Sequence, residues 1–169
     1  MYVHEGLGYD ESNGNRRKLV NTKYFGGVYE KPEDLWLEVS KYINEQYDVD
    51  KIETIYLSGD GASWIKTGLD WLPKSIFVLD NYHMQKYIKQ ATGHLDNDIR
   101  QELRDAIDWA DKEDLKKVFN KILKQTEEAS KYNSVKNCRR YFLNNWEGIK
   151  IKAEKEDEIV GCRDRKSVV

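Results

Sequence analysis

The chain has 169 residues, of which 39% are hydrophobic and 12% are aromatic, and this composition excludes a disordered polypeptide. Its length suits one domain, or a core domain that carries an insertion. Charged residues make up 34% of the chain but nearly cancel to a net charge of −2, so any binding to nucleic acid must depend on local basic patches.

The first part of the chain predicts a β-hairpin followed by a helix. Residues 1–5 and 18–29 have the character of strands, and the polar stretch 6–17, which contains Asn-Gly, is typical of the loop between them. Pro32, followed by two acids, favours the start of a helix. Apolar residues then recur at helical spacing: Leu35, Trp36, Val39, Tyr42 and Ile43.

The next segment predicts a βαβ unit. One strand-like run ends at Asp60, a helix-length stretch follows over residues 63–72, and a second strand-like run ends at Asp80. Parallel strands connected in this way place their carboxyl ends at one edge of the sheet, where open α/β sheets bind ligands. Two carboxylates at that edge are suited to a divalent cation, and such sites support metal-dependent phosphoryl transfer.

From residue 84 to about residue 146 the apolar residues recur at spacings of three and four, which predicts an all-helical block. Asp96 and Asp111 occupy positions typical of helix caps. The block contains no apolar run long enough to span a membrane. Because Cys138 and Cys162 lack CxxC spacing and no signal peptide is evident, we expect reduced cysteines and a cytoplasmic protein.

Each acidic residue of the βαβ unit has two interpretations. Asp60 lies between two glycines and could be a metal ligand or catalytic carboxylate, or it could cap the helix that begins near Ala62. Asp80 could likewise cap the next helix. His83 follows three residues later, at a spacing that permits either a structural Asp–His pair or a shared metal site.

One region is locally basic. Residues 131–152 contain six basic residues and one acid, a local charge of +5, with four aromatic residues interleaved. Basic and aromatic side chains together favour contact with a DNA backbone and stacking on its bases, although a solvated amphipathic helix has the same composition. The predicted DNA-binding residues are Lys136, Arg139, Arg140 and Trp146.

Three motifs of this sequence resemble those of bacterial insertion-sequence DDE transposases. They are YVHEG at residues 2–6, YLSGDGASWI at residues 56–65 and VLDNYHMQKYI at residues 78–88. The most similar branch is related to the Mutator-like group and was long labelled only as an uncharacterised protein family. The resemblance covers residues 1 to about 162.

The resemblance implies an RNase H-like α/β core, with a mixed five-stranded sheet and a helical insertion after the last core strand. Residues 1–83 would form part of this core, residues 84–158 the insertion and residues 159–169 an atypical tail. It further implies three acids that bind Mg²⁺ and cut or join DNA at transposon ends. Asp60 matches the second acid of this triad, whereas Asp80 and His83 match an accessory Asp-x-x-His motif.

The sequence also departs from the family pattern. The strand that carries the first acid would precede residue 2, and GC at residues 161–162 is followed by RDRK instead of the expected Glu. We therefore expect a truncated fragment that keeps one acid of three and is inactive alone, with an open sheet edge that favours homo-oligomers. No small-molecule cofactor and no membrane contact are expected.

Two alternatives remain open from the residues alone. The first is a DNA-binding or regulatory remnant that acts through the basic helical block. The second is an unrelated α/β phosphohydrolase that uses Asp60 and Asp80 together, for which turnover of small phosphoesters would be the test.

Overall fold

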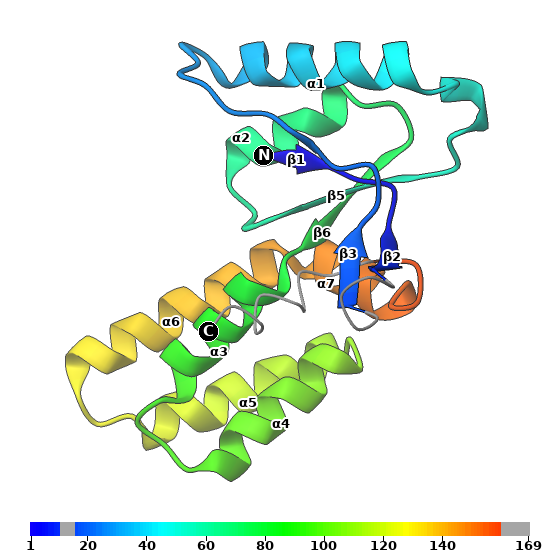
Figure 1. Cartoon of the computed structure of the whole chain (residues 1–169). Coiled ribbons are helices and arrows are strands. Elements are labelled where there is room, and N and C mark those ends of the chain that lie inside the picture. The colour runs from blue at the N-terminus through cyan, green and yellow to red at the C-terminus, as the bar shows by residue number, and fades with distance from the viewer. Residues whose placement is uncertain (11–15, 160–169) are drawn as a thin grey trace. The chain divides into compact units, whose positions relative to one another are not determined.

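The chain opens with two short antiparallel pairs of strands (Figure 1). The computed structural model describes residues 1–10 and 16–159. Strand β1 (Tyr2–Val3) pairs with β4 (Lys23–Tyr24), and β2 (Leu7–Asp10) pairs with β3 (Arg16–Leu19).

The predicted hairpin is confirmed, but its paired part is longer than expected. The sequence predicts residues 7–10 and 16–17 as loop, yet they form ladder pairs, with Asp10 opposite Arg16. Their polar composition concealed the strands because this ribbon is largely exposed and needs no apolar face. The Asn-Gly turn at residues 13–14 lies outside the described part of the chain.

Helix α1 (Pro32–Gln46) provides much of the core of the first of two compact units, which contains residues 1–57 and 62–77. The helix begins with Pro32 as predicted, and four residues of its predicted stripe are buried. Trp36 is completely buried and its indole Nε1 donates a 2.8 Å hydrogen bond to the carbonyl of Trp64. The apolar stripe therefore anchors α1 to the segment that follows β5.

That segment is not the continuous helix that residues 63–72 predict. It divides into a short helix α2 (Ser63–Lys66) and a 3₁₀ turn η3 (Thr67–Asp70). The carbonyl of Trp64 accepts from the Thr67 hydroxyl, at 2.7 Å, as well as from Trp36. These side chains take the place of the backbone donor that would continue an α-helix through Gly68. A further 3₁₀ turn, η2 (Val49–Lys51), precedes β5.

Strands β5 (Ile55–Gly59) and β6 (Ser75–Leu79) form the predicted parallel pair. The amide of Ile55 donates to the carbonyl of Lys74, and the amide of Asp80 donates to the carbonyl of Gly59. Because these bonds join start to start and end to end, the two strands run in the same direction. Asp60 and Asp80 therefore follow neighbouring strand ends, as the sequence predicts.

The expected five-stranded sheet does not form within residues 1–10 and 16–159. The strands make three separate two-stranded sheets, and the chain is a mixed α/β protein with seven α-helices in this part. β1 and β4 pair over only two residues each, and β5 pairs only with β6. The RNase H-like arrangement that the resemblance implies stays a prediction.

The predicted helical block is confirmed. The second compact unit contains residues 58–61 and 78–159, so it includes the ends of β5 and β6. Helix α3 packs against α4 and α6, and α5 packs against the same two helices. The helices are α3 (Asn81–Thr92), α4 (Asn97–Asp108), α5 (Lys112–Gln125), α6 (Ala129–Asn144) and α7 (Trp146–Glu154).

Local signals at the helix starts are partly confirmed. Asp111 caps α5 by accepting from the amide of Asp114, whereas Asp96 occupies the cap position of α4 without a side-chain cap bond. In the part of the chain that the structure describes, no helix is both long and apolar enough to cross a membrane.

Candidate functional site

The ends of β5 and β6 place Asp60 and Asp80 near the same tyrosine, within the second unit. Burial is the main reason that the pKa of the Tyr141 phenol is raised, with a smaller contribution from Tyr87. The negative charges of Asp80 and Asp60 raise it further. The sequence thus correctly predicts that the two carboxylates share one neighbourhood.

These carboxylates do not complete a metal site by themselves. Among the residues that the structure describes, no three His, Cys, Asp or Glu side chains come together to hold a metal ion. Carboxylate oxygens are nevertheless the hard ligands that Mg²⁺ prefers, so the side chains of Asp60 and Asp80 are of the type that could form part of such a site.

Asp80 and His83 form a closely bonded pair. One oxygen of Asp80 accepts from the backbone amide of His83 at 2.8 Å, which caps α3, and the other lies 2.7 Å from Nδ1 of the imidazole. Since a carboxylate oxygen accepts, Nδ1 of the ring is assigned as the donor of this bond. The side chains are 15% and 29% exposed.

Both structural interpretations of Asp80 are therefore confirmed at once, because it caps the helix and holds the imidazole. Its two oxygens are already engaged with His83, which disfavours the alternative in which Asp80 acts as an equal partner of Asp60 in a phosphohydrolase. A metal-binding role for either residue stays a prediction.

Helix α6 holds the turn that carries Asp60. The hydroxyl of Tyr141 donates a 2.7 Å hydrogen bond to the backbone carbonyl of Asp60, and its ring stacks on Tyr87 with centroids 3.7 Å apart. One turn later, the buried side chain of Asn145 lies against Gly61, where an added Cβ would come within 2.7 Å of Asn145 Cγ. Gly61 also has a φ of +84°, which favours glycine.

Sequence reasoning missed this contact. In the sequence, Tyr141 is one of the four aromatic residues of the basic stretch, and nothing in the sequence distinguishes Asn145. The hydrogen bond spans 81 residues, so no local spacing could have indicated it. A glycine directly after a strand-end aspartate was the only signal of close backbone approach.

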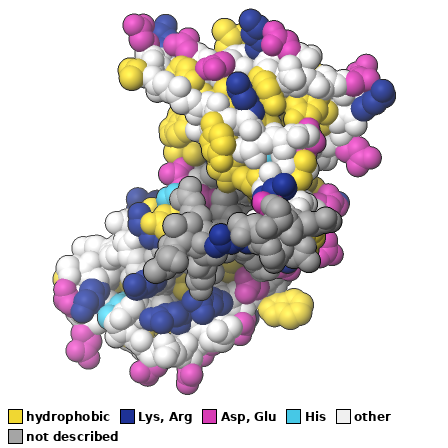
Figure 2. All heavy atoms as spheres, in the orientation of Figure 1, with side chains coloured by type: hydrophobic (Ala, Val, Ile, Leu, Met, Phe, Trp, Pro, Cys, Tyr) yellow, Lys and Arg dark blue, Asp and Glu magenta, His cyan; other side chains and the backbone are white. Residues whose placement is uncertain are grey.

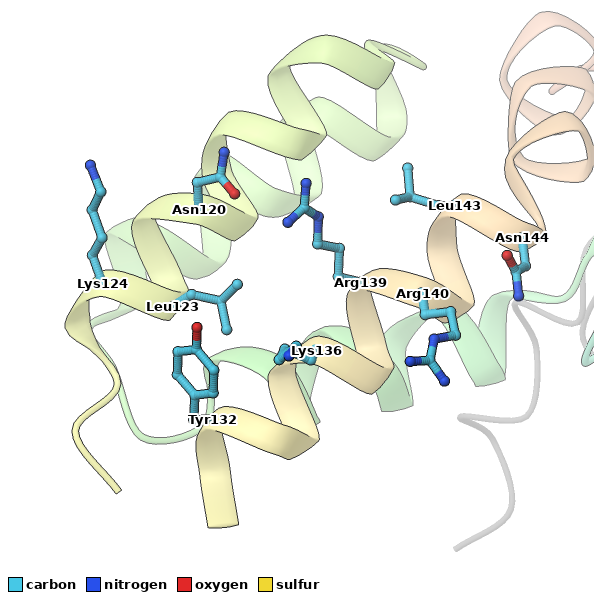
Figure 3. A pocket seen from close by; sticks show the side chains of 9 residues that line it. All are labelled: Asn120, Leu123, Lys124, Tyr132, Lys136, Arg139, Arg140, Leu143 and Asn144. Carbon is cyan, nitrogen blue, oxygen red and sulfur yellow. The ribbon is translucent and has the colours of Figure 1, made fainter. Parts of the chain in front are cut away.

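A groove with a volume of about 690 Å³ lies between α5 and α6 in the same unit (Figure 3). We call it the basic groove, because four cationic side chains and no carboxylate line it. Figure 2 shows Lys and Arg side chains close together over the helical part of the face in view. The lining residues are Asn120, Leu123, Lys124, Tyr132, Lys136, Arg139, Arg140, Leu143 and Asn144.

Three of the four predicted DNA-binding residues line the basic groove, and the fourth does not. Lys136, Arg139 and Arg140 are brought together there, whereas Trp146 is only 5% exposed and packs at the start of α7. A buried indole is not available to stack on a base. Its place in the basic stretch of the sequence favours a DNA contact, but in the fold it is buried, with the Lys112 ammonium 6.0 Å from its ring centroid.

A family model described as an uncharacterised protein family, UPF0236, matches residues 1–168. The chain is similar to UPF0236 proteins TTE2489 and TTE0402 of Caldanaerobacter subterraneus subsp. tengcongensis, with 48% identity over 162 residues in each case. The match covers 96% of this chain but 34% and 32% of those relatives, so the chain spans about a third of their length.

A further relative from the same organism, with the same identity and coverage of 96% of this chain and 34% of its own length, has a name that joins eleven locus designations, from TTE0033 to TTE2212. No solved structure matches the chain significantly.

Proposed function

The chain belongs to the uncharacterised protein family UPF0236, and we propose that it is a segment of the catalytic domain of an insertion-sequence DDE transposase. The observation that carries the proposal is the parallel β5–β6 pair, because its two strand ends present Asp60 and the bonded Asp80–His83 pair. These are the positions that the transposase motifs of the sequence assign to one catalytic acid and to the accessory Asp-x-x-His.

The relatives support this proposal independently. One name covers eleven loci of a single organism, and another covers four. Such multiplicity is expected of an element that copies itself through a genome, whereas a housekeeping enzyme is encoded once or a few times.

The residues would divide the work as follows. Asp60 would be a ligand to Mg²⁺ in the whole enzyme, and the bound metal would activate water or a 3′-hydroxyl for attack on a DNA phosphodiester. Tyr141 positions Asp60 by holding its carbonyl, and Asp80 positions the imidazole of His83. The bond from Tyr141 on α6 thereby fixes the main chain of the residue whose carboxylate would hold the metal.

We further propose that this chain does not cleave DNA alone, since it covers about a third of its relatives and the structure describes no complete metal-binding cluster. The chain should fail to nick supercoiled DNA bearing the element's terminal repeats in Mg²⁺ or Mn²⁺. Metal-dependent nicking that disappears in Asp60→Ala would contradict this expectation.

A chimera tests the function itself. The 162 residues of this chain that match UPF0236 protein TTE2489 would replace the corresponding segment of that protein, and excision of a marked element would be measured in cells. The chimera should excise the element, Asp60→Ala should abolish excision, and Asp70→Ala, at an exposed aspartate of η3, should preserve it. Full excision by the Asp60→Ala chimera would overturn the assignment.

The basic groove favours a second candidate, a DNA-binding or regulatory segment that acts through the helical block and needs no metal. The two candidates are compatible within one enzyme, because the strand-end residues would serve phosphodiester cleavage and the groove would serve phosphate binding.

A further inference from the structure

Among the residues that the structure describes, no ion pair neutralises the positive charge of the basic groove. Elsewhere on α5 and at the start of α6, lysines have acidic partners: Lys116 with Glu113, Lys117 with Asp114, Lys121 with Glu102 and Lys131 with Glu128. Within residues 1–10 and 16–159, by contrast, no ion pair involves any of the four groove cations, Lys124, Lys136, Arg139 or Arg140. Four like charges along one groove repel each other unless an anion occupies it.

Arg139 provides a second indication that the basic groove is suited to an anion. Its Nε is buried and has no hydrogen-bond partner in the described part of the chain. An unsatisfied buried donor is costly, and guanidinium groups match phosphate oxygens in geometry. Figure 3 shows the Arg139 side chain extending from α6 towards Asn120 on α5, so the two helices can contribute donors to one ligand.

Tyr132 gives the groove an aromatic surface. Tyr132 is 39% exposed to solvent, and the Lys136 ammonium lies 5.8 Å from the centroid of its ring. A cation beside an exposed ring is typical of sites where a phosphate backbone passes an unpaired base that stacks on the ring. A groove of about 690 Å³ is in the size range of small-ligand sites, which suits a short stretch of a single strand.

We propose that the basic groove binds a single strand of DNA, with the four cations on successive phosphates and Tyr132 stacked on a base. The choice of DNA as the polymer rests on the proposed function, but the groove requires neither Asp60 nor a metal. Lys124 is a binding residue that the sequence did not indicate, whereas Tyr132 is one of the four aromatic residues of the basic stretch. Trp146, which is buried, is not a binding residue.

Fluorescence anisotropy with a labelled dT20 oligonucleotide and a 20-base-pair duplex tests the proposal on the full chain. The double variant Lys124→Glu/Arg140→Glu should bind dT20 at least tenfold more weakly. The matched control Lys116→Glu/Lys117→Glu makes the same change of charge on α5 outside the groove and should change binding less than threefold. Four phosphate contacts predict a slope of about −3 for log affinity against log salt, which the groove variant should reduce by about half.

Tyr132 separates stacking from charge. Tyr132→Phe should bind like the unmodified chain, whereas Tyr132→Ala should lose about fivefold or more in affinity for dT20. Far-UV circular dichroism of every variant checks that it folds. Equal losses in the groove variant and its control would overturn the site, and duplex binding as tight as dT20 binding would overturn the single-strand assignment.

The outcome is separable from that of the proposed function. Asp60→Ala should bind dT20 normally while abolishing excision in the chimera. Loss of DNA binding with excision retained would overturn the groove alone, and the reverse result would overturn the catalytic assignment alone.

Discussion

The hydroxyl of Tyr141 donates a hydrogen bond to the backbone carbonyl of Asp60, at 2.7 Å. The bond joins the last part of α6 to the turn after β5, and it engages the main chain of Asp60 instead of its carboxylate. Tyr141 can therefore orient Asp60 through this bond without occupying a carboxylate oxygen.

Removing that hydroxyl should loosen the turn. Tyr141→Phe keeps the ring stack on Tyr87 but removes the hydrogen bond from the Tyr141 hydroxyl to the Asp60 carbonyl, so the free energy of unfolding should fall by about 1 kcal/mol. Urea unfolding followed by circular dichroism measures the change. Tyr132→Phe, at an exposed tyrosine, is the control and should change stability by less than about 0.5 kcal/mol. Equal effects of the two variants would contradict the assigned role.

Gly61 should tolerate no side chain. Gly61→Ala combines a positive φ with a collision against Asn145, so it should cost roughly 1–3 kcal/mol in unfolding free energy. Gly26→Ala is the matched control, because an added Cβ there meets nothing within 4 Å. Adding Asn145→Ala to Gly61→Ala should relieve the collision but not the backbone strain, so only part of the stability should return.

Asp80 should matter more than an ordinary helix cap. Asp80 and Asp111 each accept from a backbone amide three residues later at 2.8 Å, but only Asp80 also holds an imidazole. Asp111→Ala should cost about 1 kcal/mol, and Asp80→Ala should cost about 1 kcal/mol more. Thermal unfolding of both variants, and of each combined with His83→Ala, measures the extra interaction. If His83→Ala leaves the difference between the two aspartates unchanged, the ring bond contributes nothing.

The chain should lose stability in alkali through Cys138. Burial raises the pKa of this thiol from 9.0 to about 11. Between these values the unfolded chain releases a proton that the folded chain keeps, so the free energy of unfolding falls as pH rises. Urea unfolding at pH 8, 9, 10 and 11 should show the decline, and Cys138→Ala should flatten it. The raised pKa of Tyr141 acts in the same direction above pH 10 and should leave a residual slope.

Local signals were sufficient for much of the fold. Residues close in sequence determine the apolar stripe of α1 and the caps at Asp80 and Asp111. They also determine the β5–β6 pair, whose strands are followed by Asp60 and Asp80. The division of residues 63–72 could not be predicted in this way, because it depends on Trp36, which lies 28 residues before its acceptor.

The candidate site shows the same limit. Lys136, Arg139 and Arg140 could be selected from one basic stretch, but Lys124 joins them only because α5 packs against α6. Trp146 has the sequence context of a DNA contact and the burial of a core residue. The contact of Tyr141 with Asp60 likewise requires the packed helices, since its partners are 81 positions apart.

Helix α6 contains groove residues and the strand-end contact in adjacent positions, with Arg139 and Arg140 directly before Tyr141. The helix advances about 100° per residue, so their relative directions depend on an uninterrupted helical phase. Inserting one alanine between Arg140 and Tyr141 would keep every side chain yet rotate the two sites out of phase. Lengthening the loop before α6 would leave that phase intact. The rotational phase of this single helix thus sets the angle at which a DNA strand held by the basic groove would meet Asp60.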